Sequence, residues 1–148
     1  MEFNELVADF SERHGVSGMT AEDGAAALEI DGITVMMIAS ADDLMLSAEI
    51  GEPPAEGVAV FANLLLEASL QSESYFAKTP DSGSYVLVRR LSLPSIDADA
   101  FDAALESLVN QAETWRRMLA DFRPVAQAAA EHAEEESQSF GTSGFMQV

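Results

Sequence analysis

A turn signal at residues 31 and 32 constrains the fold of this chain more than any other local feature. Asp31-Gly32 separates two stretches with the composition of strands. Before it, Leu28 and Ile30 alternate with polar residues, and after it the apolar run 33–39 begins at once. Asp-Gly between two such stretches favours a type I′ turn, because both central residues of that turn need a positive φ. The sequence therefore predicts an antiparallel β-hairpin.

Further strand patterns extend this hairpin into a sheet. In residues 44–50 apolar side chains occupy every second position, which is the period of a half-buried strand. Two more strand stretches, 74–78 and 84–91, flank a Pro-Asp-Ser-Gly sequence that is typical of a β-turn. We therefore expect three consecutive strands early in the chain and two later ones.

Two amphipathic helices frame the predicted sheet. The first ends at His14-Gly15, and its apolar stripe consists of Phe3, Leu6, Val7 and Phe10. A longer stripe runs over 101–122, after Asp97, a residue type suited to an N-cap. The expected fold is α+β in the order helix, three strands, helix, two strands, helix, with the helices packed against a twisted antiparallel sheet. We expect residues 1–123 to form this single domain.

The segment 56–70 has helical character but is apolar nearly all round. A helix that touches only one layer of a protein keeps a polar face, and this one has too little of it. In a domain of this size, the cover expected for its second side is another subunit. The sequence therefore predicts a homodimer, with an interface that includes Val58, Phe61, Leu64 and Leu65.

The strand run 33–39 is apolar on both of its faces. Ile33, Val35 and Met37 alternate with Met36 and Ile38. Either helices cover both faces of the sheet, or one face stays exposed as an apolar groove in which flexible methionines adapt to different ligand side chains. Both accounts remain open at this point.

Charge limits the kinds of partner. The 148 residues include seven basic and 26 acidic side chains, for a formal net charge of −19. Such a surface repels phosphate backbones and anionic lipid heads, so neither nucleic acid nor a membrane is expected as a partner. The last stretch, 124–148, contains no lysine or arginine, and we expect it to form an acidic, flexible tail.

Few residues suit catalysis. Cysteine is absent, which excludes disulfides and thiolate metal sites. His14 lies where a helix is expected to end, and His132 lies among solvated glutamates. No phosphate loop, nucleophile elbow or dinucleotide fingerprint occurs. We therefore expect neither catalysis nor a metal ion nor a cofactor. The N-terminus lacks the pattern of a secretory signal, which predicts a cytoplasmic location.

Four stretches resemble one family in their order and pattern. They are 44–51 before two prolines, 64–70 in the central helix, 83–91 in the final strand and 101–119 in the last helix. In these stretches the chain resembles the class I type III secretion chaperones, the Tir chaperone (CesT-like) family. Ser69 departs from the pattern, because many members have asparagine there.

The resemblance implies a bacterial, cytoplasmic homodimer that binds the N-terminal region of a secreted effector without ATP. The effector segment would run in extended form, add a strand and place side chains in apolar patches. The expected client surface uses the first helix and the second sheet face, namely Phe3, Leu6, Met36, Ile38 and Met45. The alternative is a YbjN-like regulatory or adaptor module of the same fold that binds a folded partner.

Overall fold

The computed structural model describes residues 2–16 and 20–123. The order of elements confirms the predicted one, with an additional short strand after the first helix. The predicted tail, 124–148, lies outside the described residues. In chain order the elements are α1 (Phe3–His14), β1 (Thr20–Glu22), β2 (Ala25–Ile30), β3 (Ile33–Ser40), β4 (Asp43–Gly51), α2 (Val58–Leu70), β5 (Tyr75–Lys78), β6 (Tyr85–Ser92), the 3-10 turn η1 (Leu93–Ser95) and α3 (Ala98–Ala120).

The strands form one antiparallel sheet in the order β1-β2-β3-β4-β6-β5. The predicted hairpin is confirmed, because Asp31 and Gly32 connect β2 to β3 with φ values of 52° and 79°. Asp23 and Gly24 connect β1 to β2 with φ values of 52° and 76°. After α2, the chain returns with β6 beside β4, which leaves β5 as an edge strand.

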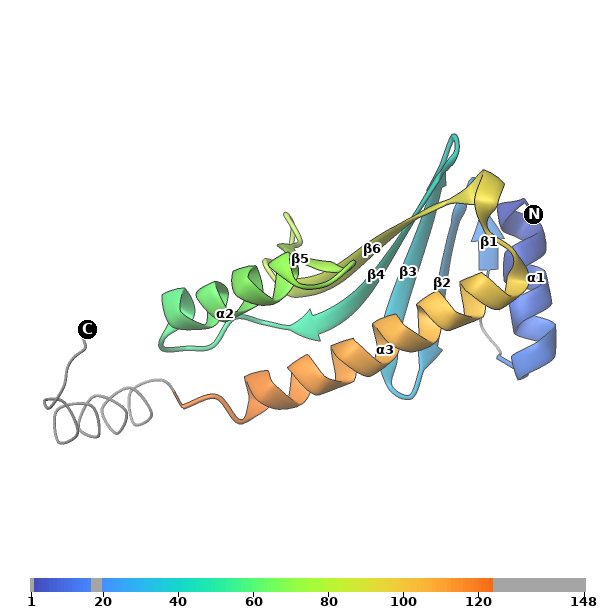
Figure 1. Ribbon diagram of the computed structural model, residues 1–148. Helices are drawn as coiled ribbons and strands as arrows, with labels where there is room; N and C mark the ends of the chain where they lie inside the picture. Colours follow the sequence, from blue (N-terminus) through green and yellow to red (C-terminus); the bar gives the residue numbers. More distant parts are fainter. Residues whose placement is uncertain (1, 17–19, 124–148) are drawn as a thin grey trace, which may run out of the picture.

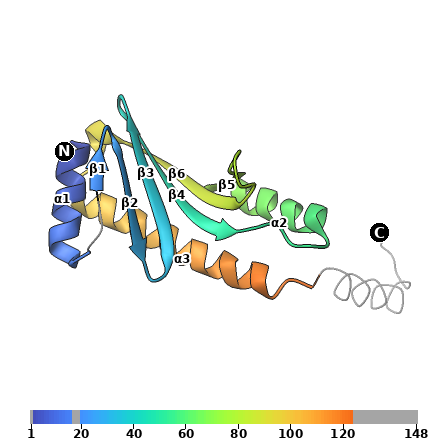
Figure 2. The ribbon, with the colours of Figure 1, turned by 180° about the vertical axis from the view of Figure 1, so that it is seen from behind.

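Helix α3 runs along one face of the sheet, with α1 at one end of the molecule and α2 at the other (Figure 1). Seen from behind, strands β2 and β3 pass in front of α3, and no helix lies over their near face (Figure 2). Exposure alternates accordingly along β3, where Val35 and Met37 are buried and Met36 and Ile38 are exposed. Of the two accounts that the sequence allowed, the described chain therefore has the exposed apolar face.

Aromatic contacts join both other helices to α3. Near the start of α3, Phe101 packs edge-on against Phe10 of α1, with ring centroids 5.8 Å apart. Near its end, Trp115 packs edge-on against Phe61 of α2 at 6.1 Å and against Phe76 of β5 at 5.0 Å. Such pairs contribute about 0.5–1.5 kcal/mol each beyond their buried area. These contacts determine which sides of α1 and α2 remain exposed.

Candidate protein-binding surfaces

Helix α2 turns one side toward the core of its own chain. It begins after Gly57, whose φ of 74° lies in the left-handed region that favours glycine. Phe61 and Leu65 point inward and are 0% and 4% exposed. Phe61 stacks on Tyr85 of β6, with ring centroids 5.7 Å apart. This inner side attaches α2 to the sheet.

The other sides of α2 are apolar and exposed. Leu66 is 64% exposed and Leu70 is 88% exposed. We define the α2 face by the exposed apolar residues of this helix, which are Val58, Val60, Leu64, Leu66 and Leu70. An apolar surface of this kind marks an interaction site in soluble proteins. Among the predicted dimer contacts, Val58 and Leu64 lie on the α2 face, whereas Phe61 and Leu65 fill the core of the same chain.

A pocket of about 170 Å³ opens between α2 and β5. Apart from Lys78 and the Tyr85 hydroxyl its lining is apolar; it consists of Ala62, Leu65, Leu66, Phe76, Ala77, Lys78 and Tyr85. The Tyr85 hydroxyl is buried and has no hydrogen-bond partner among the described residues. Burial also raises the pKa of Tyr85.

Ser69 fastens α2 to the edge strand. Its hydroxyl donates to the carbonyl oxygen of Leu65 at 2.9 Å and accepts from the backbone N–H of Phe76 at 3.1 Å. Because β5 lies at the edge of the sheet, this bond occupies an N–H that an added strand would otherwise use. Strand addition is therefore disfavoured at this part of β5. The departure from the family pattern at Ser69 thus coincides with a defined structural contact.

The sheet face opposite α3 carries the second exposed apolar surface. Met36 and Ile38 are 43% and 42% exposed, and Met45 is partly exposed. Ile38 of β3 lies opposite Met45 of β4, and Met45 lies opposite Arg90 of β6. We define the open face as Met36, Ile38, Met45, Tyr75 and Arg90. The structure thus brings together three of the predicted client-binding residues on adjacent strands.

The first helix offers less apolar surface than expected. Phe3 and Leu6 were expected on a client surface, but they are 7% and 0% exposed. The reason is that the apolar stripe of α1 packs into the core, which leaves mainly polar positions outside. Phe3 still lines a hollow of about 600 Å³ between the first turn of α1, the β3–β4 turn and η1. Leu6 is enclosed.

Charged contacts join the end of α1 to α3. Arg13 donates to both carboxylate oxygens of Asp102, and Nε2 of His14 lies 3.1 Å from the same carboxylate. The hydrogen bonds from Arg13 hold the pKa of Asp102 below its usual value. Asp9 accepts from Nε of Arg13 at 2.7 Å. This cluster therefore has a structural explanation, and His14 lies in the last turn of α1 as the sequence predicts.

The described residues offer little for chemistry. Residues 2–16 and 20–123 contain no group of three His, Asp or Glu side chains that could hold a metal ion. Over the same ranges, no helix combines the length and the apolar character that a membrane crossing requires. His132 and its neighbouring glutamates lie outside the described residues. The exposed features of the described chain are apolar surfaces suited to binding another polypeptide.

An α+β domain with an exposed apolar helix and an exposed apolar sheet face belongs to the class of protein-binding modules. Comparison with known families is more specific, because residues 5–116 match the Tir chaperone protein (CesT) family. The chain belongs to this family, as the sequence predicted. Membership supports a chaperone role toward an effector, in a family of binding proteins rather than enzymes.

Individual relatives agree with this assignment. ExsC of Pseudomonas aeruginosa, a transcriptional anti-antiactivator, is 27% identical over 125 residues, which cover 78% of this chain and 84% of ExsC. A chain of the ExsC–ExsE complex superimposes with a TM-score of 0.70 at 23% identity, covering 80% of this chain and 97% of that one. The HopA1–SchA chaperone–effector complex gives 0.65 at 14% identity, covering 78% and 93%. YbjN from E. coli gives 0.52 at 17% identity, covering 88% and 94%. These structural likenesses confirm the predicted α+β fold.

Proposed function

We propose that this chain is a homodimeric chaperone that binds the N-terminal region of a type III secretion effector in extended form, without ATP, in the bacterial cytoplasm. The observation that carries the proposal is the presence of two exposed apolar surfaces, the α2 face and the open face, on a family member with a net charge of −19. Exposed apolar surfaces of this kind are sites of association. High net charge keeps such a protein in solution while the surfaces remain available.

The α2 face suits a second copy of the chain. In a dimer with two-fold symmetry the same residues meet from both sides, so every apolar side chain of the interface contributes twice. Leu66 and Leu70 are the most exposed members of the face, at 64% and 88%. The proposed interface is the α2 face rather than Phe61 and Leu65, because side chains that fill their own core cannot contact a partner. The adjoining pocket beside Tyr85 is available to the same partner.

The open face suits an extended client segment. Adjacent strands lie about 4.8 Å apart, so Met36, Ile38 and Met45 form a continuous apolar surface. An extended peptide directs alternate side chains to one side, and flexible methionines adapt to different ones. Phe3, which lines the hollow beside the first turn of α1, contributes a further apolar contact, and Leu6 takes no part. Where the client adds a strand, the β1 side of the sheet is favoured, because Ser69 occupies part of the β5 edge.

Co-expression tests the proposal. N-terminal segments of secreted proteins encoded beside this chain are produced with it and purified through a tag on the chaperone. The expected result is a stable complex in which the client segment stays sensitive to protease, because it is held extended. Ile38→Glu should lose the segment, and Ala103→Glu, which adds the same charge at an exposed position of α3, should retain it. Failure of every such segment to co-purify would count against the chaperone role.

A regulatory role is the second candidate, and the similarity to ExsC favours it. In this role the chain binds a regulatory protein and thereby changes transcription. In the YbjN-like adaptor hypothesis, too, the chain binds a folded protein rather than an extended segment. A partner that remains protease-resistant in the complex, together with altered reporter transcription when the open face is substituted, would favour regulation over secretion.

A further inference from the structure

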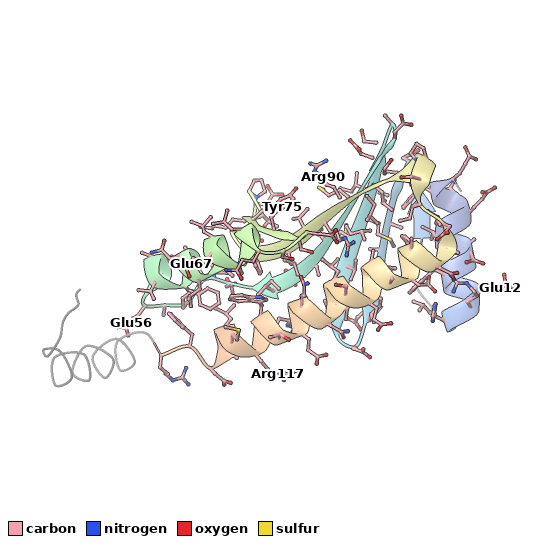
Figure 3. All side chains as sticks on the ribbon, in the orientation of Figure 1. Glu12, Glu56, Glu67, Tyr75, Arg90 and Arg117 are labelled. Atoms are coloured by element: carbon pink, nitrogen blue, oxygen red, sulfur yellow. The ribbon has the colours of Figure 1, made fainter. Side chains whose placement is uncertain are left out.

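Arg90 stands within the open face. It lies on β6 opposite Met45 of β4, and Met45 lies opposite Ile38 of β3. Arg90 and Tyr75 project from the sheet on the side away from α3 (Figure 3). A cation is therefore set among the exposed apolar side chains to which the proposed client binds.

The guanidinium of Arg90 is oriented by the protein but forms no ion pair among the described residues. Its Nε donates to the Tyr75 hydroxyl at 3.2 Å, which leaves the terminal nitrogens for other acceptors. Arg13, Arg89 and Arg117 each pair with a carboxylate, whereas Arg90 forms no ion pair within residues 2–16 and 20–123. Arg116 and Arg123 form none there either, but their terminal nitrogens donate to backbone carbonyls. Asp43, two residues before Met45 on β4, attracts the guanidinium of Arg90 but forms no ion pair with it, so the terminal nitrogens stay open to a carboxylate of the client.

This inference rests on the proposed client binding and specifies the chemistry of the client. We infer that Arg90 binds an aspartate or glutamate side chain of the client segment, set beside apolar residues that cover Ile38 and Met45. The planar guanidinium presents parallel N–H donors that match the two oxygens of a carboxylate. The hydrogen bond to Tyr75 restricts the guanidinium before binding, which lowers the cost of ordering it.

Local and overall charge act differently here. The net charge of −19 attracts basic segments at long range. At contact distance, however, only the groups around Arg90 decide its partner. Met45 lies opposite it and Tyr75 accepts a hydrogen bond from it, while Asp43, on the same face of β4, attracts the guanidinium without forming an ion pair. The acidic residue is thus a requirement at one position of the client, not a preference of its whole composition.

Strand spacing limits where that residue lies in the client. Ile38 and Arg90 are two strands apart, since β4 separates β3 from β6. At about 4.8 Å per strand, roughly 10 Å separates them across the sheet. An extended segment rises about 3.3 Å per residue and covers this distance in about three residues. Because alternate side chains point to the same side, the carboxylate is expected two or four residues from the apolar side chain that covers Ile38.

Selection from a library of short random peptides displayed on phage tests the inference. The full chain is immobilised as wild type, as Arg90→Glu and as Arg123→Glu. Arg123 is the matched control, because it undergoes the same change of charge and its own hydrogen bonds go to the backbone carbonyls of Ala120 and Phe122. Circular dichroism verifies folding, and Arg90→Gln serves if Arg90→Glu does not fold.

Wild type and Arg123→Glu should enrich apolar peptides that carry Asp or Glu at the stated spacing, and Arg90→Glu should lose the acidic preference. Changing the acidic residue of a selected peptide to its amide should weaken binding to wild type about 3- to 10-fold, because the contact is charge-assisted but exposed. The same change should not weaken binding to Arg90→Glu and should strengthen it, because it removes the repulsion between two carboxylates. A lysine at that position should restore part of the binding to Arg90→Glu.

Two outcomes would overturn the inference while the proposed function stands: apolar peptides without an acidic preference, or an acidic preference that survives in Arg90→Glu. Ile38→Glu separates this failure from that of the proposed function. If Ile38→Glu captures the same peptides as wild type, the open face is not the binding surface, and the client proposal fails as well.

Discussion

Leu66→Glu tests the proposed dimer at its most informative position. Leu66 is 64% exposed in the single chain and lies on the α2 face. Complete burial of a leucine side chain contributes about 1.5–3 kcal/mol, so the exposed part of Leu66 offers roughly 1–2 kcal/mol per copy. Two-fold symmetry doubles this to about 2–4 kcal/mol. The dissociation constant of the dimer should therefore rise roughly 30- to 1,000-fold.

Sedimentation equilibrium over a dilution series measures this effect. The single chain has a mass of 15.8 kDa, so the wild type should approach twice that mass and Leu66→Glu should return toward it at the same concentration. Ala103→Glu adds the same charge at an exposed position of α3 and should sediment like the wild type. Equal dissociation constants for Leu66→Glu and wild type would refute the placement of the interface. A wild type that stays at 15.8 kDa would refute the dimer itself.

Other substitutions test the core, the α1–α3 contact and the buried hydroxyl. Phe61→Ala should lower the free energy of unfolding by about 3–5 kcal/mol in guanidinium chloride, because Phe61 is fully buried among aromatic rings; a loss below 1 kcal/mol would contradict its core position. Because the pKa of Asp102 is lowered in the folded protein, its carboxylate stabilises the fold above the unfolded-state pKa of about 4. This stabilisation is lost as the pH falls through the folded-state pKa. The urea midpoints of the wild type and Asp102→Asn should therefore converge in acid. A difference between the two urea midpoints that does not change with pH would exclude this explanation. Tyr85→Phe should leave stability unchanged or raise it by up to about 1 kcal/mol, because the hydroxyl lacks a partner. Because burial raises the pKa of Tyr85, the unfolded wild type loses the hydroxyl proton more easily than the folded one. As the pH rises above about 10, the wild type should therefore lose stability relative to Tyr85→Phe.

Local turn chemistry accounts for much of what the sequence predicted about the fold. The type I′ turn at Asp31-Gly32 and the N-cap at Asp97 depend on neighbouring residues alone, and the structure contains both; Asp97 accepts from the backbone N–H of Ala100 at 2.8 Å. Asp23-Gly24 carries the same turn signal, yet the strand before it was not predicted. The strand β1 has only three residues, Thr20–Glu22, which are too few to show an alternating pattern.

Which side of a helix faces the core depends on contacts between residues that lie far apart in the sequence. Apolar residues surround α2, so the pattern indicated an unusual helix but could not tell the inner side from the outer one. Phe61 is an inner residue because it meets Tyr85 and Trp115, which follow it by 24 and 54 positions. On β3, by contrast, strict alternation placed Met36 and Ile38 together on one face. Only the packing of α3 determines that this face is the exposed one.

In the sequence, Arg90 is distinguished only by its neighbour Arg89. Its role in the open face depends on the registers of β4 with β6 and of β5 with β6, which place it beside Met45 and within reach of Tyr75. Arg89, its neighbour in sequence, pairs instead with Glu73. Two adjacent arginines therefore have different surroundings, because successive residues of a strand face opposite sides of the sheet.

Methyl NMR of the methionines is the most direct test of client binding at the open face. The chain, labelled at its methionine methyl groups, is titrated with the effector segment that it retains in co-expression. Met36 and Met45 should shift as the segment binds, and Met37, which is fully buried on the opposite side of the same strand, should not. Shifts at Met37 without shifts at Met36 and Met45, or binding that leaves all three unchanged, would contradict an extended client on this face.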